Sequence, residues 1–251
     1  MTAFLTTKDL RFSRNGREIL RIDEFGLRKG ETLALVGPNG AGKSSLLLIL
    51  ALLQTPTSGT IIFDGQISGK GNLLAMRRRM ALVFQDALLL DMSVKKNLTI
   101  PLKFRGIPRF EADKRVATWL ERFGITHLAN QPARNLSGGE AQRVSLSRAC
   151  ALQPEILLLD EPFAALDYPT KKDLLGQLAG ILQDMKTTTI FVTHDFTEIP
   201  YVASQVAVLL DGRIIRQGPV SKIFGESFGN GSAFAPWESV SRMDPVRPAG
   251  N

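Results

Sequence analysis

The stretch that decides the fold is TLALVGPNGAGKS, residues 32–44. It opens with a mostly apolar run, Thr32–Val36, of the kind found in strands buried on both faces. The rest fits the pattern G-x-x-x-x-G-K-[S/T], and the run Ser45–Leu50 that follows is predicted to be a helix. Glycines let the backbone curl so that several N–H groups point at one anion, and the helix N-terminus adds partial positive charge. The stretch therefore predicts a strand, a phosphate-binding loop and a helix.

The loop is expected to hold a nucleoside triphosphate. Lys43 is predicted to reach the β- and γ-phosphates, and the Ser44 hydroxyl is a candidate ligand of Mg²⁺. A glycine-rich turn can arise by chance, but the strand before it and the helix after it favour a phosphate site. ATP and Mg²⁺ are the predicted cofactors. The predicted binding residues here are Gly37, Pro38, Asn39, Gly40, Ala41, Gly42, Lys43, Ser44 and Ser45.

An acidic pair is predicted to complete this site. Asp160 and Glu161 follow the apolar run Ile156–Leu159. A carboxylate at the end of a buried strand beside a phosphate loop can hold Mg²⁺, so we assign that role to Asp160. Glu161 is predicted to polarise an attacking water, a general-base effect that contributes about 10²–10⁴-fold in rate. Such a pair alone often marks only the start of a loop, and its meaning here comes from the phosphate loop.

Short apolar runs alternate with helical patterns along most of the chain, which indicates an α/β fold. Between about residues 88 and 135 the pattern is helical, and it includes one apolar face expected to be core. The members of this face are Val116, Trp119, Leu120 and Phe123. From Gly225 onward there is little periodicity, which predicts a poorly ordered tail, residues 225–251. Further strands are expected at Met80–Phe84, Ile156–Leu159, Thr189–Val192 and Val206–Leu210.

Composition narrows the class of protein. The chain has 44% hydrophobic and 22% charged residues and a net charge of +7, a globular balance whose charge alone does not distinguish membrane, nucleotide or nucleic-acid contacts. Arg77, Arg78 and Arg79 are expected to be a solvated helix face. The one cysteine, Cys150, excludes an internal disulfide and is expected to be packed in a helix. No signal peptide or run of 18 apolar residues is evident, which predicts a cytosolic protein.

Together these motifs resemble the nucleotide-binding subunits of ATP-binding cassette (ABC) transporters. The resemblance is carried by Leu136-Ser137-Gly138-Gly139-Glu140 with Ala141-Gln142-Arg143, which looks like the signature sequence of that family. The same residues also fit a serine N-cap with a glutamate three residues later, a capping box. The resemblance implies a P-loop NTPase core of ABC type, residues 1–88 and 136–224, with N-terminal antiparallel strands and an inserted helical subdomain, residues 89–135.

The resemblance further implies a dimer of two copies of this chain. In the family, the signature residues contact the γ-phosphate of ATP bound to the opposite subunit, so each site is composite. The implied contacts are Ser137, Gly138, Gly139 and Glu140. Hydrolysis would remove the bridging phosphate and open the pair.

Three smaller elements match the family. Gln85 looks like a residue that senses Mg²⁺ and the γ-phosphate, although a lone glutamine after a strand is otherwise a surface residue. Asp167 resembles the loop that communicates across the dimer, and it also suits a helix N-cap. His194 resembles the switch histidine, whereas His127 has no partner motif. The implied catalytic residues are Lys43, Gln85, Glu161 and His194, and the implied metal ligands are Ser44, Gln85 and Asp160.

The chain departs from the family pattern at several positions. Arg14 stands where an aromatic ring usually contacts adenine, and Phe12 lies two residues earlier on the expected strand face, so either could make that contact. Ala165 replaces a frequent serine, and Tyr168 separates Asp167 from proline. Pro200 follows the switch histidine and is expected to kink the helix there.

The importer type of ABC transporter is predicted, because the segment Gln85–Leu98 looks like importer sequences whose helical subdomain offers a groove to the membrane subunit. The expected partners are separate transmembrane permease subunits and, through them, an extracytoplasmic solute-binding protein, with no nucleic acid. This places the protein peripherally on the cytoplasmic face of the cell membrane. Among importers the chain is most like the tungstate or molybdate oxyanion type. A soluble ABC-type scaffold for cofactor or complex assembly and a small-molecule P-loop kinase remain as alternatives.

Overall fold

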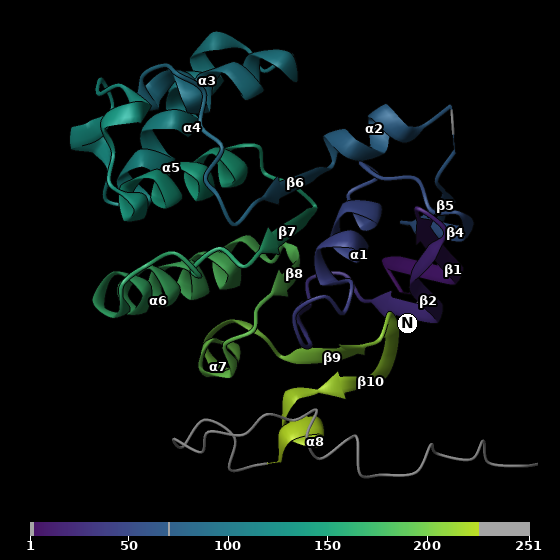
Figure 1. Ribbon diagram of the computed structural model, residues 1–251. Coiled ribbons are helices and arrows are strands. Elements are labelled where there is room, and N and C mark those ends of the chain that lie inside the picture. Colours follow the sequence, from purple (N-terminus) through teal and green to yellow (C-terminus); the bar gives the residue numbers. More distant parts are fainter. Residues whose placement is uncertain (1–2, 70, 226–251) are drawn as a thin grey trace, which may run out of the picture.

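A four-stranded antiparallel sheet forms one side of the computed structural model, which describes residues 3–69 and 71–225 (Figure 1). Its strands follow the order β2-β1-β4-β5. They are β1 (Leu5–Arg14), β2 (Arg17–Leu27), β4 (Ser58–Phe63) and β5 (Gln66–Ile67). The loop between β1 and β2 is Asn15-Gly16, and both residues have positive φ, 52° and 77°. Paired positive φ angles match the right-handed twist of the flanking strands, so this sequence closes a tight hairpin.

A second sheet of six strands lies at the centre, in the order β10-β9-β3-β8-β7-β6. All neighbours are parallel except the β9–β10 pair. The strands are β3 (Thr32–Val36), β6 (Met80–Val83), β7 (Ile156–Asp160), β8 (Thr188–Val192), β9 (Gln205–Leu210) and β10 (Arg213–Pro219). The strands predicted from apolar runs are confirmed to within a residue at each end. Because the parallel strands share a direction, the residues that follow β3, β6, β7 and β8 meet at one edge.

Alternate residues of the central strands pack into separate hydrophobic cores. In β7, Ile156 and Leu158 join the cluster that includes α1 and the antiparallel sheet, whereas Leu157 and Leu159 join the cluster formed with the helices. All four are fully buried, as the alternation of side chains along a strand requires. Burying one such leucine contributes about 1.5–3 kcal/mol, so these strands hold the edge that carries the acidic pair.

Helices cover the central sheet, and one group of them projects from it (Figure 1). The predicted apolar face at Val116, Trp119, Leu120 and Phe123 is confirmed, since all four are at most 5% exposed. Cys150 is buried in a helix, as expected. The projecting group holds α3 (Val94–Phe104), α4 (Arg109–Arg122), the 3₁₀ turns Thr126–Leu128 and Ala133–Asn135, and α5 (Gly138–Ala151). The others are α1 (Lys43–Leu50), α2 (Leu73–Arg78), α6 (Tyr168–Met185), the 3₁₀ turn Phe196–Glu198, α7 (Ile199–Val202) and α8 (Val220–Phe224).

Two sequence predictions about single residues are wrong. Arg79 is not part of a solvated face: it bonds Glu155 and Asp64, each at 2.5 Å, and lies over the Phe63 ring at 4.3 Å. It thereby joins the antiparallel sheet to the start of β7. Pro200 does not kink a helix, because it lies in the first turn of α7, where no intrahelical N–H bond is needed.

The predicted tail, residues 225–251, lies outside the described residues apart from Gly225. Among the helices that the structure describes, none is both long and apolar enough to cross a bilayer.

Candidate functional site

The loop between β3 and α1 can be closed only by glycine at two points. A Cβ on Gly37 would lie 2.1 Å from the Leu209 carbonyl oxygen, and one on Gly42 would lie 2.6 Å from Leu20 Cδ2. Gly42 also has φ of 103° and is the N-cap of α1, with no side chain capping the helix. The first N–H groups of α1 are therefore free of a side-chain acceptor, which is the arrangement that binds anions at helix N-termini.

Lys43 folds back over this loop. Its Nζ donates to the carbonyl oxygens of Gly37 at 3.0 Å and Pro38 at 3.2 Å, and it lies 3.8 Å from Glu161 Oε1. The residue is 6% exposed. Burial lowers the pKa of its ammonium, against the opposing effect of Glu161 and Asp160. The loop thus encloses one cation at its centre, suited to a phosphate oxygen.

Ser44 and Asp160 meet across the loop, as the sequence predicts for a pair that shares a metal ion. The Ser44 hydroxyl donates to Asp160 Oδ1 at 3.2 Å. Burial raises the pKa of the Asp160 carboxyl, an effect opposed by the Ser44 hydrogen bond. One hydroxyl and one carboxylate oxygen are the donors that Mg²⁺ takes from protein when phosphate and water complete its shell. The donor set therefore fits Mg²⁺.

Glu161 lies between the phosphate loop and His194. One of its oxygens faces Lys43, and the other is 2.8 Å from His194 Nδ1. Its backbone has φ of 45°, a left-handed conformation that costs free energy for a residue with a side chain and that clusters at functional sites. Its N–H donates to the Val192 carbonyl at 3.1 Å, which joins the turn after β7 to the end of β8. The left-handed turn thus places this carboxylate between the loop and the histidine.

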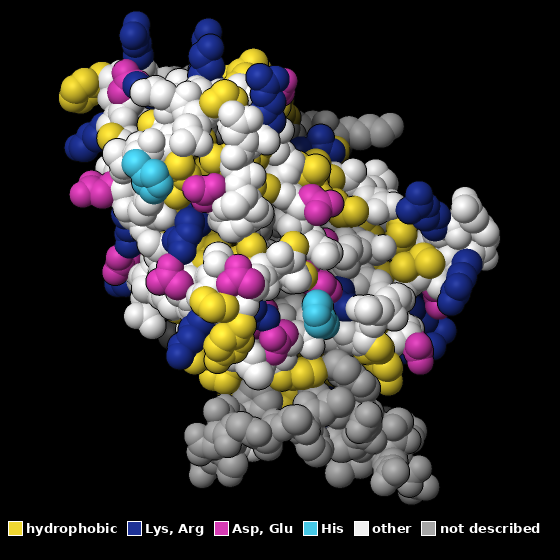
Figure 2. Space-filling model, turned by 60° about the vertical axis from the view of Figure 1, so that its left-hand side comes forward, with side chains coloured by type: hydrophobic (Ala, Val, Ile, Leu, Met, Phe, Trp, Pro, Cys, Tyr) yellow, Lys and Arg dark blue, Asp and Glu magenta, His cyan; other side chains and the backbone are white. Residues whose placement is uncertain are grey.

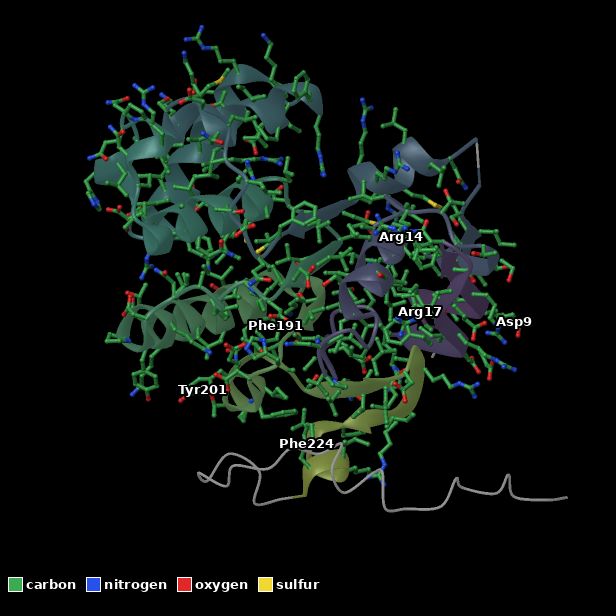
Figure 3. All side chains as sticks on the ribbon, in the orientation of Figure 1. Asp9, Arg14, Arg17, Phe191, Tyr201 and Phe224 are labelled. Atoms are coloured by element: carbon green, nitrogen blue, oxygen red, sulfur yellow. The ribbon has the colours of Figure 1, made fainter. Side chains whose placement is uncertain are left out.

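Of the other predicted residues, some share this edge and some do not. Gln85 follows β6 and is exposed. Asp167 is the N-cap of α6, where its side chain accepts from the Thr170 N–H at 3.1 Å. Phe12 is 6% exposed inside the core, whereas Arg14 at the end of β1 is exposed (Figure 3). Of the two, only Arg14 is free to contact a base.

The residues 137–140 begin α5 with a complete capping box. The Ser137 N–H donates to Glu140 Oε2 at 2.8 Å, and the Glu140 N–H donates to Ser137 Oγ at 3.3 Å. The backbone bond from Ser137 lowers the pKa of the Glu140 carboxyl. Gly139 packs against Thr170, since a Cβ there would lie 2.8 Å from Thr170 Cγ2, but a Cβ on Gly138 would meet nothing within 4 Å. Ser137 and Gly138 at this helix start are exposed, and the helix start is not brought to the phosphate loop within the chain.

Sequence reasoning missed the residues that surround His194. Thr193 and Glu198 are buried, and Glu198 bonds Lys171 of α6. Lys171 is far from the histidine in the sequence, so only the folded structure shows that it bonds the glutamate beside the histidine. The sequence shows a glutamate shortly after the histidine, but only the structure shows that this glutamate is buried.

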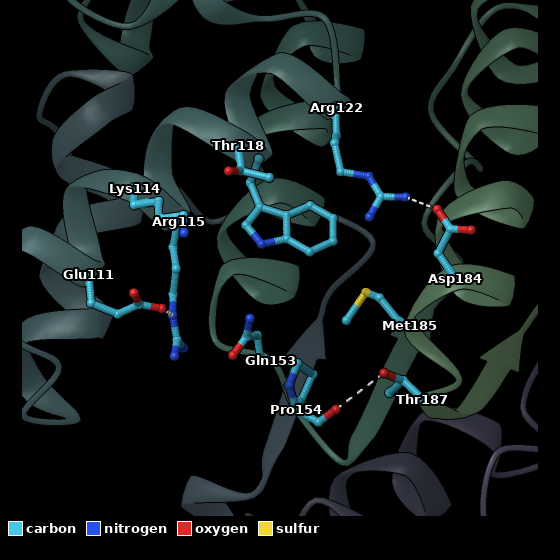
Figure 4. A pocket seen from close by; sticks show the side chains of 11 residues that line it. Glu111, Lys114, Arg115, Thr118, Arg122, Gln153, Pro154, Asp184, Met185 and Thr187 are labelled. Carbon is cyan, nitrogen blue, oxygen red and sulfur yellow. Dashed lines mark hydrogen bonds and ion pairs between the residues drawn. The ribbon is translucent and has the colours of Figure 1, made fainter.

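A separate cavity of about 480 Å³ lies at the opposite end of the strands, next to Pro154 and Thr187 (Figure 4). Its cations are largely matched: Arg122 pairs with Asp184, and Arg115 pairs with Glu111 at 2.7 Å. The Arg122–Asp184 pair joins α4 to α6. Because Pro154 and Thr187 precede β7 and β8, this cavity is remote from the phosphate loop and forms no part of the candidate site.

Comparison with known proteins gives one consistent family. The sequence model of the ABC transporter family matches residues 20–164. The molybdate/tungstate import ATP-binding protein of Thermococcus kodakarensis is 39% identical over 84% of this chain and 64% of its own length. The methionine import ATP-binding protein of Xanthomonas euvesicatoria pv. vesicatoria is 38% identical over 85% and 65%. The sulfate/thiosulfate import ATP-binding protein of Thermosynechococcus vestitus is 39% identical over 80% and 60%. This chain thus spans less than two thirds of these relatives.

Two solved structures share the fold. The protein cbiO1 of Clostridium perfringens, described as part of the ABC transporter complex cbiONQ, superposes with a TM-score of 0.82 at 30% identity, covering 90% of this chain and 92% of that one. An ATP-binding cassette solved as a dimer in a post-hydrolysis state with ADP and Pi has a TM-score of 0.75 at 29% identity, covering 86% and 98%. The fold is therefore the ABC-type P-loop α/β fold, with its antiparallel sheet and helical subdomain.

Proposed function

This chain belongs to the ABC transporter family, and we propose that it is the ATP-hydrolysing, nucleotide-binding subunit of an importer of bacterial type. The observation that carries the proposal is the arrangement around Glu161. Its carboxylate lies 3.8 Å from Lys43 Nζ and 2.8 Å from His194 Nδ1, beside the pair Ser44 and Asp160. Cation, metal ligands, base and histidine are thus gathered at one edge of the sheet, as hydrolysis of a phosphoanhydride requires.

Each of these residues has a task suited to its surroundings. Lys43 and the first N–H groups of α1 bind and orient the β- and γ-phosphates. Ser44 and Asp160, with Gln85 after β6, would hold Mg²⁺, which when bound would neutralise charge on the phosphate oxygens. Glu161 accepts a proton from the attacking water. His194 orients Glu161 and contacts the γ-phosphate, and Arg14 contacts the adenine.

The second partner in the site is another copy of this chain. The α5 start carries Ser137 and Gly138 on an exposed surface, with Gly139 half-buried beside them, and a second copy would bring this helix start to the phosphates held by the first. The related cassette solved as a dimer with ADP and Pi supports this arrangement. Asp167, at the start of α6, then lies in the loop that communicates across the dimer.

Membrane passage is assigned to separate permease subunits. A groove of about 720 Å³ lies between α3 and α4, and lysine and arginine side chains project from this region of the surface (Figure 2). This groove in residues 89–135 is the proposed contact with the permease, on the cytoplasmic face of the membrane. The residues of the groove include Met92, Lys95, Lys96, Ile100, Lys103 and Arg109.

The proposed cargo is an oxyanion such as tungstate or molybdate, delivered through an extracytoplasmic binding protein. The support is the similarity to the Thermococcus importer subunit. Relatives for methionine and for sulfate are about as similar, so the cargo needs its own test. Membranes that hold the full complex should import radiolabelled molybdate in competition with unlabelled tungstate but not with methionine or sulfate. Competition by methionine or by sulfate, with none by tungstate, would assign that solute as the substrate instead.

The test of hydrolysis is phosphate release with no acceptor other than water. Wild-type protein should release phosphate, and Glu161→Gln should lower turnover by about 10²–10⁴-fold, because it removes the general base. The variant should still bind ATP and elute as a dimer with ATP on size-exclusion chromatography. Phosphate transfer that needs a small-molecule acceptor would indicate a kinase. Normal hydrolysis by Glu161→Gln would show that another group is the base.

A further inference from the structure

A partly buried ionic network surrounds the backbone on both sides of His194. Thr193 Oγ1 donates to Glu198 Oε2 at 2.6 Å, and the Asp195 N–H donates to Thr193 Oγ1 at 2.9 Å. Lys171 Nζ reaches Asp195 Oδ2 at 2.6 Å and also pairs with Glu198. The residues immediately before and after the histidine are therefore both tied to one lysine of α6, Thr193 through Glu198 and Asp195 directly.

Two members of the network are buried, whereas the side chains of Lys171 and Asp195 are 19% and 33% exposed. Glu198 and Thr193 are 3% and 2% exposed, whereas the His194 side chain is 53% exposed. Burial raises the pKa of the Glu198 carboxyl. Burial also opposes the charge on Lys171, but its bonds to Asp195 and Glu198 outweigh that effect and raise the pKa of its ammonium. The lysine therefore stays charged between two carboxyl groups.

Such a network is weak evidence for a stabilising role. Replacing a buried ion pair by apolar side chains of similar volume is often neutral or stabilising, although removing one member leaves a costly unpaired charge. The charged side chains here provide orientation, because their hydrogen bonds fix the backbone turn that carries His194. The ring itself has one hydrogen-bond partner among the described residues, Glu161 Oε2, so its position depends on the backbone beneath it.

We propose that Lys171 is a positioning residue for His194: through Asp195 and Glu198 it fixes the turn after β8 and so sets the imidazole against Glu161. Lys171 lies in the first turn of α6, four residues after the N-cap Asp167, and its N–H donates to the Asp167 carbonyl at 2.9 Å. A shift of the α6 start would thus reach the histidine through the lysine. The proposal rests on the hydrolytic role proposed above for Glu161 and His194.

The experiment compares Lys171→Met with Lys171→Arg and with Lys172→Met, an exposed neighbour on the same helix. Lys171→Met should lower kcat for ATP hydrolysis by about 10- to 100-fold, the scale of a misplaced catalytic group, with KM little changed because ATP is bound elsewhere. Lys171→Arg should retain most of kcat, and Lys172→Met should match wild type. Should Lys171→Met fail to fold, Lys171→Met/Glu198→Leu removes both charges of that ion pair and is measured in its place.

A double-mutant cycle with His194→Ala separates positioning from general damage. If Lys171 acts through His194, Lys171→Met should lower kcat by no more than about twofold in the His194→Ala protein. An equal loss in both backgrounds, or no loss in either, would overturn the proposal. By contrast, an inactive wild type, or a fully active His194→Ala, would count against the hydrolytic role itself.

A spectroscopic readout is also within reach, because the chain has two histidines. In the imidazole NMR spectrum, Lys171→Met should shift or broaden the His194 signal and leave the His127 signal in place. Lys172→Met should move neither. An unchanged His194 signal in Lys171→Met would contradict positioning even if the activity had fallen.

Discussion

Helices α1 and α5 both begin with backbone N–H groups that could face an anion, but the chain treats the two starts differently. Around the α1 start it supplies Lys43 and, from the next strand but one in the sheet, Asp160 and Glu161. Around the α5 start it supplies a capping box between Ser137 and Glu140, and Gly138 faces open space. The first is a site assembled by one chain. The α5 start is a complete helix terminus but an incomplete binding site, as expected of a surface that completes the site of a second copy.

The largest expected effect separates the two starts by ATP affinity. Lys43→Ala removes the cation enclosed by the loop and should weaken ATP binding by about 10- to 100-fold, since a hydrogen bond to a charged group contributes about 1.5–3 kcal/mol. Ser137→Ala, at the other start, should leave the affinity of the isolated chain within about twofold, because that serine meets ATP only in a dimer. Titration calorimetry at concentrations that keep the protein monomeric measures both. An unchanged dissociation constant for Lys43→Ala would remove the lysine from the site.

The next prediction tests whether the α5 start serves the opposite copy. In a mixed dimer, Ser137→Arg in one copy and Lys43→Ala in the other damage the same composite site twice. One site stays intact, so about half of the wild-type activity should remain. With both changes in one copy and a wild-type partner, each composite site carries one lesion and activity should be lost.

Two differently tagged chains, purified as mixed dimers, allow this comparison by phosphate release. Sites confined to single chains predict the reverse: separate lesions would abolish activity, and lesions in one copy would leave half. The two arrangements of the same substitutions are matched in composition, so each is the control for the other.

What the sequence predicts well is whatever neighbouring residues decide. The strand, loop and helix of residues 32–50 follow from one apolar run and the glycines after it. The capping box at Ser137 follows from a serine and a glutamate three residues apart. Asp160 and Glu161 can be assigned to the phosphate site from the sequence because parallel strands end at one edge of their sheet. Predictions fail where segments distant in the sequence decide the outcome: Phe12 is buried in the core, and Arg79 meets carboxylates from two separate loops.

The same limit hides Lys171. Its contacts with Asp195 and Glu198 depend on how α6 packs beside the end of β8, and no spacing in the sequence encodes that packing. The side chain reads as one of several helix lysines until the fold places it.

The smallest expected effect distinguishes the two helix starts by the pH dependence of stability. The folded pKa of Glu140 is lowered by the Ser137 N–H, so its contribution is present above the ordinary glutamate pKa and is lost as pH falls through the folded value. Asp160 has the opposite sign: burial raises its folded pKa, so its effect favours the fold at low pH and disappears as pH rises through that value.

Glu140→Gln should cost less than about 1 kcal/mol near neutral pH, since this carboxylate is partly exposed, and the cost should shrink on acidification. Asp160→Asn should instead stabilise the nucleotide-free chain near neutral pH. Urea unfolding at a series of pH values measures both slopes, and slopes of the same sign would show that the two starts are not electrostatically opposed.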